Sequence, residues 1–229
     1  MTGITSRIAL CAAVLLTGST AASAVPSVVN SAFNNATAPA VSATDLINGS
    51  AGVVTGAALA GQEDTSTDVN DLTNGTFGLP NLPAGLPETV SISNNTTITY
   101  SLNTIAFPAG YNITGVDVYA GWRDSGRDNI DVSVLFSTVA NPLVFNTYHT
   151  VSFAAGAGGG ASSLITDTTG LLATNVAAVR FTFPTQENGY VGYRELDVHG
   201  VGVQAIPEPT SLAALSLGGL ALLRRRRTA

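Results

Sequence analysis

From residue 89 onward the chain repeats one pattern, in which apolar residues stand at every second position of short runs. Strand side chains point alternately to two faces, so this period is typical of strands with one buried face. Gly, Asn, Asp and Pro between the runs favour turns. We therefore predict an all-β, antiparallel β-sandwich for residues 45–204. The runs are YNITGVDVYAGW at 111–122, NIDVSVLFST at 129–138, TYHTVSFAA at 147–155, AAVRFTF at 177–183 and GYVGYRELDVHGVGV at 189–203.

Four other stretches carry a weaker pattern. Residues 25–44 have no sustained period and are predicted to be a loose N-terminal arm, with a leading strand as the alternative. Three prolines in 79–87 forbid a central strand and favour a crossing loop. In the run 89–103, apolar and polar residues alternate on both sides of an Asn-Asn turn, which predicts a hairpin or a bulged strand. GAGGGASS at 156–163 predicts a flexible surface loop, since the Lys-Ser/Thr of a phosphate-binding loop is missing.

The charge balance limits the partners. The chain has no lysine, and residues 25–206 hold four arginines against fourteen carboxylates. A body this acidic repels phosphate backbones, so we predict no nucleic-acid partner. The single cysteine, Cys11, lies in the N-terminal segment, so removal of that segment leaves no disulfide and no thiolate metal site.

The N-terminus has the three parts of a secretory signal peptide. Arg7 is followed by an apolar run at 8–16 and by Ala22-Ser23-Ala24. We predict a signal peptide over 1–24, cut by signal peptidase after Ala24, with Ala22 and Ala24 as the cleavage-site residues. A buried N-terminal helix is the alternative. The apolar run is too short to span a bilayer, which needs about 20 residues.

The C-terminal segment 205–229 joins a Pro-Glu-Pro motif, an apolar stretch and four arginines. Proline is accepted at the start of a helix, so Pro207 and Pro209 are compatible with a helix that begins just after them. The apolar stretch that follows predicts a short transmembrane helix over 210–223. Its length of roughly 21 Å is marginal for a bilayer core of about 30 Å. The arginines would stay on the cytoplasmic side.

This order of features closely resembles the PEP-CTERM sorting signal of bacterial envelope proteins. The resemblance implies that an exosortase-type enzyme recognises the motif after a transient inner-membrane tether. It further implies delivery to the cell surface or the extracellular space. The implied sorting residues are Pro207, Glu208, Pro209, Arg224, Arg225, Arg226 and Arg227.

A second resemblance covers residues 42–203. The strand order, with a Trp and a Gly-Arg turn, AAVRFTF and the closing YRELDVHG, is similar to discoidin or galactose-binding-like jelly rolls. DLTNGTFG at 71–78 resembles the early Asp-Gly-rich turn of that family. The resemblance implies a jelly-roll β-sandwich that binds carbohydrate.

The densest chemistry lies in GWRDSGRD at 121–128. A tryptophan face stacks on sugars, and arginine or aspartate binds their hydroxyls. The predicted ligand-binding residues are therefore Trp122, Arg123, Asp124 and Arg127. In the alternative, Trp122 faces the core and Arg127 pairs with an acid, the candidates being Asp128, Asp131 and Glu195.

A metal candidate lies upstream. Asp68, Asp71, Asn74 and Thr76 offer hard oxygen ligands within nine residues, which suits calcium. Related jelly rolls often hold calcium at such a turn. A solvated turn is the alternative, and no other cofactor is predicted.

Catalytic patterns are weak. His149 and His199 lie in strand-like contexts. Glu187, Glu195 and several aspartates offer the carboxylate pair that a glycoside hydrolase needs, but any acidic chain offers such pairs by chance. We predict no catalytic residues and no enzymatic activity. The predicted function is an exported surface or matrix protein that binds exopolysaccharide. A purely structural or adhesive component is the alternative, and a secreted glycoside hydrolase is a remote one.

Overall fold

The computed structural model describes residues 25–34, 37, 39–63, 65–78 and 86–204. The predicted signal peptide, residues 79–85 of the proline-rich loop and the predicted helix 210–223 lie outside the described residues. Within the described ranges, no helix has both the length and the apolar character needed to cross a bilayer.

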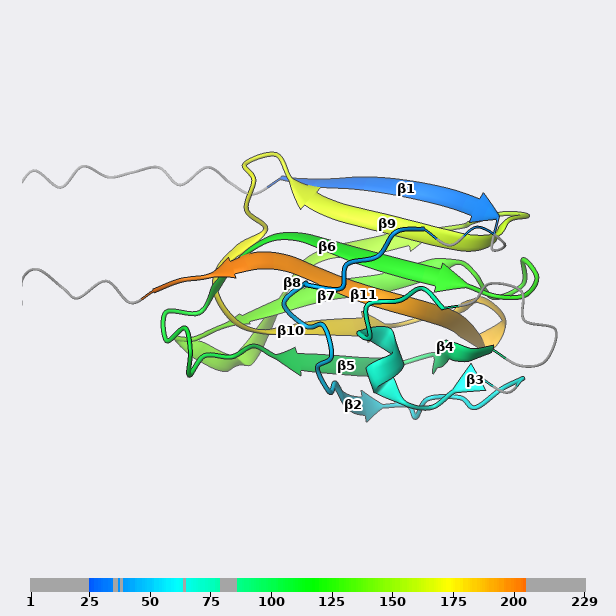
Figure 1. Cartoon of the computed structure of the whole chain (residues 1–229), viewed down its shortest axis with the longest axis horizontal. Coiled ribbons are helices and arrows are strands. Elements are labelled where there is room, and N and C mark those ends of the chain that lie inside the picture. The colour runs from blue at the N-terminus through cyan, green and yellow to red at the C-terminus, as the bar shows by residue number, and fades with distance from the viewer. Residues whose placement is uncertain (1–24, 35–36, 38, 64, 79–85, 205–229) are drawn as a thin grey trace, which may run out of the picture.

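The described residues form eleven strands and two short 3₁₀ turns (Figure 1). This confirms the all-β prediction for the body. The elements are β1 (Pro26–Asn34), β2 (Val53–Gly56), β3 (Thr65–Ser66), η1 (Val69–Leu72), β4 (Leu86–Ser93), β5 (Thr96–Ser101), β6 (Tyr111–Gly121), β7 (Ile130–Thr138), β8 (Asn141–Phe153), β9 (Gly159–Asp167), β10 (Ala173–Phe183), η2 (Glu187–Gly189) and β11 (Tyr190–Gly202).

One continuous ladder curls into two halves. The first half runs in the order β1-β9-β6-β11-β4-β3, and the second in the order β2-β5-β10-β7-β8. Among the described strands, only a short pairing of β10 with β6, at Ala173↔Ile113 and Val176↔Tyr111, joins the two halves. All described pairings are antiparallel except that of β3 with β4.

Both halves contribute to one apolar core. Val116 and Val118 of β6 join Leu196 and Val198 of β11 in the same cluster as β5, β7 and β10 side chains. The period-two pattern places these residues on the inner face. The intervening positions of β6 and β11 therefore point away from this core, and they carry the polar residues described below.

Two segments predicted to be loose belong to the sheet instead. Residues 26–34 form β1, which pairs with β9 at nine positions along the edge of the first half (Figure 1). The loose-arm prediction is therefore wrong for them. Residues 159–163 of GAGGGASS belong to β9. A Cβ added at Gly160 would lie 2.4 Å from the Phe33 ring of β1. Glycine allows this close approach of the two strands.

The Asn94-Asn95 turn joins the two halves and forms no hairpin. β4 pairs with β11, while β5 pairs with β10 and β2. Asn95 adopts φ 63°, a left-handed conformation that asparagine tolerates. The predicted turn position was correct, but the predicted hairpin partner was wrong, since alternation within a strand does not identify its neighbour.

Candidate functional site

A polar cluster covers the outward face of β6 and β11. Glu195, Asp197 and His199 alternate along β11, and Asp117 lies on β6 directly opposite Asp197. Asp45 joins them from the segment that crosses the two strands. We call these five residues the acid cluster.

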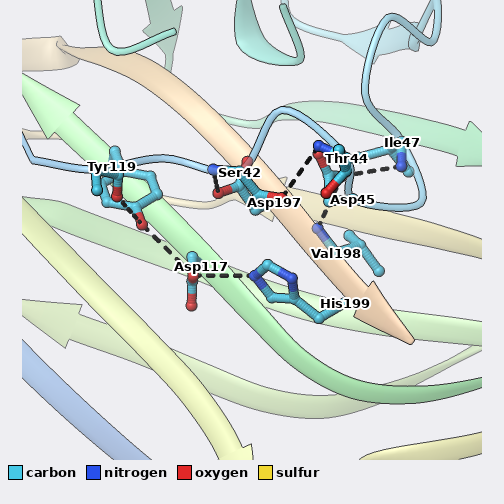
Figure 2. Close-up of polar contacts among 10 residues, drawn as sticks. Ser42, Thr44, Asp45, Ile47, Asp117, Tyr119, Asp197, Val198 and His199 are labelled. Carbon is cyan, nitrogen blue, oxygen red and sulfur yellow. Dashed lines mark hydrogen bonds and ion pairs between the residues drawn. The ribbon is translucent and has the colours of Figure 1, made fainter. Parts of the chain in front are cut away.

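The crossing segment, residues 40–48, is held down by hydrogen bonds to both strands (Figure 2). The Ser42 amide donates to Asp197 Oδ2 at 2.8 Å, and the Tyr119 hydroxyl donates to the Ala40 carbonyl at 3.2 Å. Asp45 Oδ1 accepts from the Val198 amide at 3.1 Å. The segment therefore buries the cluster from above.

One side chain of the cluster carries a basic group. His199 Nε2 lies 3.1 Å from Asp117 Oδ2, and the Tyr119 hydroxyl reaches the same oxygen at 3.5 Å. One ligand atom each from Asp117, Asp197 and His199 lies within 4.8 Å of the others. None of the described arginines forms an ion pair with the four carboxylates of the cluster.

Burial perturbs the pKa values of these groups. Desolvation raises the pKa of Glu195 to about 8 and that of Asp197 to about 7, and neighbouring carboxylates add to both. Burial also raises the pKa of Asp45. The hydrogen bond to Asp117 raises the pKa of His199. Burial thus favours the neutral acid forms of Glu195, Asp197 and Asp45, because their charged forms are poorly solvated, whereas the hydrogen bond to Asp117 favours the charged imidazolium of His199.

The second region of interest, which we call the loop end, comprises the turn at 122–128 after β6 together with Glu63, η2 and Tyr190. Trp122 is fully buried, and a Cβ added at Gly192 would lie 2.5 Å from its ring. The Arg127 guanidinium lies 4.3 Å from the Tyr190 ring centroid and 5.5 Å from that of Trp122. Since its ring is buried, Trp122 is not available for sugar stacking in this structure.

Glu63 links the two arginines of this loop end. It lies 3.1 Å from Arg123 and 3.8 Å from Arg127, and the Arg123 side chain stays 48% exposed. Arg127 therefore pairs with Glu63 and not with the acids considered from the sequence. Asp124 accepts a hydrogen bond from the Gly126 amide at 2.9 Å, which fixes the turn. Arg123 and Asp124 are the exposed members of the predicted ligand set.

A small open pocket of about 240 Å³ lies next to this turn. Phe153 is its partly buried aromatic wall, and Glu187 Oε2 accepts from the Asp128 amide at 3.3 Å, which ties η2 to the neighbouring loop. The pocket is lined by Asn129, Ile130, Asp131, Ser152, Phe153, Ala154, Thr185, Gln186 and Glu187.

Three of the four side chains of the predicted calcium turn accept hydrogen bonds from the backbone of the turn itself. Asp68 accepts from the Asn70 amide, Asn74 from the Thr76 amide and Thr76 from the Gly78 amide. The Gly75 amide donates to Glu195 at 3.0 Å, so the turn reaches the acid cluster. Calcium binding at Asp68, Asp71, Asn74 and Thr76 stays a prediction.

Sequence reasoning considered Glu195 and His199 singly and missed the cluster. A readable signal was present, because YRELDVHG places Glu195, Asp197 and His199 at every second position of one strand. These polar residues alternate with the apolar Leu196 and Val198, so they point to the same face of the strand. Asp117 could not be added from sequence, since its pairing with Asp197 depends on strand register.

The C-terminal segment carries a known signal. The family description "PEP-CTERM protein-sorting motif" matches residues 205–227, which include Pro207, Glu208, Pro209 and Arg224 to Arg227. This confirms the predicted sorting signal and indicates an exported protein. The matched residues lie outside the described part of the structure.

The described body is similar to several solved carbohydrate-binding domains. A chitosan-binding module from a Paenibacillus sp. IK-5 chitosanase/glucanase has 16% identity and a TM-score of 0.43, covering 69% of this chain and 99% of that one. A family 32 carbohydrate-binding module of Clostridium perfringens NanJ, solved with galactose, has 8% identity and a TM-score of 0.42, covering 74% and 98%. The lectin domain of lectinolysin, solved with Lewis B antigen, has 13% identity and a TM-score of 0.41, covering 72% and 100%.

These similarities are distant, and no residue of this chain takes a role from them. A comparison with curated proteins gives no match.

Proposed function

We propose that the chain is an exported, non-enzymatic protein of the cell surface or extracellular matrix that binds polysaccharide at its loop end. The observation that carries this proposal is the pocket beside η2, on a chain with a PEP-CTERM sorting motif. The body around the pocket is proposed to be a galactose-binding-like jelly roll. Its proposed mode of binding follows from the groups at the loop end.

The loop end offers the two kinds of contact that sugars need. Phe153 gives an apolar wall for a ring face, and Asp131 gives a carboxylate for hydroxyls. Arg123 and Asp124 extend the polar surface beside the pocket. Trp122 supports this surface from below, since the Arg127 guanidinium lies over the Tyr190 ring and near the Trp122 ring, which contact each other edge to face. The proposed contacts are therefore Arg123, Asp124 and the pocket, with Arg127 as a positioning residue.

The proposed route to the surface has three steps. Signal peptidase removes 1–24, the segment 210–223 holds the chain briefly in the inner membrane, and an exosortase-type enzyme acts near Pro207, Glu208 and Pro209. Intact-mass analysis of the secreted protein, from cells with and without the processing enzyme, tests these steps. Retention of residues 205–229 on the secreted form would contradict the last one.

A polysaccharide-binding assay tests the function itself. The full chain, purified in detergent, is passed over immobilised exopolysaccharide, chitosan and galactose-containing glycans. We expect retention on at least one of them, weakened about tenfold by Phe153→Ala, since stacking on an aromatic ring contributes roughly 1 kcal/mol or more. Ile105→Ala is the matched control, because Ile105 is 94% exposed and lies outside the pocket.

The structural or adhesive alternative rests on the internal pairing of the arginines with Glu63. It predicts no retention on any glycan and equal behaviour of both variants. The remote hydrolase alternative predicts release of reducing sugar that Glu187→Gln abolishes. These outcomes separate the three functions.

A further inference from the structure

The acid cluster contains two like charges in direct opposition. Asp117 and Asp197 are cross-strand partners on β6 and β11, so their side chains leave the same face of the sheet. Like charges in this position destabilise a sheet. A proton on Asp197, the His199 imidazolium beside Asp117 or a bound cation would each reduce this repulsion.

The buried side chain of the pair has an oxygen without a partner. Asp197 is 0% exposed, and its Oδ2 accepts from the Ser42 amide, while its Oδ1 has no hydrogen-bond partner among the described residues. Asp117 Oδ1 is likewise buried and without a partner. An unsatisfied buried carboxylate oxygen is costly, and its presence points to a missing cation or proton.

His199 completes a mixed set of metal ligands. It stands two residues after Asp197 on the same face, opposite Gly115, which leaves room for the imidazole. Its Nε2 lies 3.1 Å from Asp117 Oδ2. Two neighbouring ligand atoms on one metal ion lie about 3.0–3.4 Å apart when each is about 2.1 Å from the metal. The pair thus already has the separation that chelation requires.

We propose that Asp117, Asp197 and His199 bind a divalent first-row transition-metal ion, such as Zn²⁺ or Mn²⁺. Two carboxylates and one imidazole suit these ions, whereas calcium takes oxygen ligands. The three ligand atoms, within 4.8 Å of one another, converge on one ion with small side-chain movements. The ion is distinct from the calcium predicted at Asp68, Asp71, Asn74 and Thr76.

The surroundings allow an ion to enter and keep it in place. The side chains of His199 and Asp117 are 35% and 17% exposed, so solvent reaches the set from their side. The Ser42 amide orients Asp197 from the buried side. The ion would neutralise the opposed pair and tie β6 to β11 beneath the crossing segment, which is a structural role.

A metal titration tests the site directly. The tag-free full chain, purified in detergent and treated with EDTA, is titrated with ZnCl₂ or MnCl₂ by calorimetry. We expect one saturable site, weakened at least tenfold by Asp197→Asn and by His199→Gln. His149→Ala is the matched control, because His149 is the other histidine of the chain and lies on β8.

An NMR readout keeps the test independent of folding defects in the variants. In the wild-type chain with ¹⁵N-labelled histidine, Zn²⁺ should shift the ring signals of His199 and leave those of His149 in place. Absence of saturable binding to the folded chain would overturn the proposal and indicate a proton shared by the carboxylates. Binding that survives in the Asp197→Asn, His199→Gln double variant, or that shifts only His149, would also overturn it.

Discussion

Charged groups at the loop end are exposed and paired with opposite charges, whereas those of the acid cluster are buried and mostly of one sign. At the loop end, Glu63 faces two arginines, and both partners of the Arg123 pair are substantially exposed. In the acid cluster, four carboxylates share one histidine, and Glu195 and Asp197 are fully buried. Exposed, paired charges contribute little to folding and remain available to a ligand. Buried carboxylates without enough counter-charge make stability depend on pH and on cations.

The largest effect should come from the one buried aromatic of the predicted ligand set. Trp122→Ala removes a fully buried ring packed on Gly192 and Tyr190. We expect a loss of about 3–5 kcal/mol in the free energy of unfolding, measured by urea denaturation with circular dichroism. Ile105→Ala should change it by less than about 0.5 kcal/mol. A loss below about 1 kcal/mol, with polysaccharide binding abolished, would place Trp122 in the binding surface after all.

The next effect concerns pH and belongs to the acid cluster. The pKa values of Glu195 and Asp197 are about 8 and 7 in the folded chain and near 4 when unfolded. Their protonated forms therefore favour folding, a contribution present below pH 4 and lost as the pH rises through 7 and 8. The raised pKa of His199 acts in the same direction.

In EDTA, the melting temperature should fall between pH 5 and pH 8.5, on the order of 5–10 °C for a chain of this size. Glu195→Gln and Asp197→Asn should each reduce this fall, because the amide cannot ionise. Thermal denaturation of the wild-type chain, the two single variants and the Glu195→Gln, Asp197→Asn double variant at both pH values checks it. A melting temperature that does not change with pH, or a fall of equal size in the double variant, would contradict the assignment.

The strands and the sorting motif could be predicted from the sequence, but the arrangement of the site residues could be predicted only in part. Alternation in YNITGVDVYAGW and GYVGYRELDVHGVGV correctly predicted β6 and β11, because period two is a local property of a half-buried strand. The sorting motif could also be predicted from the sequence, since its three parts follow one another along the chain. GWRDSGRD was recognised as chemically dense, although the sequence left open whether Trp122, just after β6, faces the core or the solvent.

What sequence reasoning missed depends on contacts between distant segments. The pairing of Asp117 with Asp197 needs the register of two strands 80 residues apart in the chain. The role of Glu63 as the partner of both arginines needs the path of a segment with little periodic signal. β1 was only the alternative to a loose arm, because residues 25–44 have no sustained period and the partner strand β9 begins in a glycine-rich run that resembles a loop.

A smaller effect should separate the two arginines of the loop end. Arg127 stacks on Tyr190 and is half-buried, so Arg127→Ala should cost about 1 kcal/mol of unfolding free energy through the lost cation–π contacts. Arg127→Lys should recover only part of this, since an ammonium group does not stack as a planar guanidinium does. Urea denaturation of the two variants checks the difference. Equal stability of Arg127→Ala and wild type would show that the stacking contributes nothing.

The smallest effect on stability is expected at Arg123, where the effect on binding should be larger. Its pair with Glu63 is exposed, so Arg123→Ala should cost less than about 0.5 kcal/mol. A guanidinium that binds sugar hydroxyls contributes on the order of 1–1.5 kcal/mol, so affinity for a retained polysaccharide should fall about tenfold. Surface plasmon resonance alongside denaturation measures both quantities. If Arg123→Ala and Phe153→Ala both leave affinity unchanged, the ligand binds elsewhere, and the exposed charges of the loop end serve solubility alone.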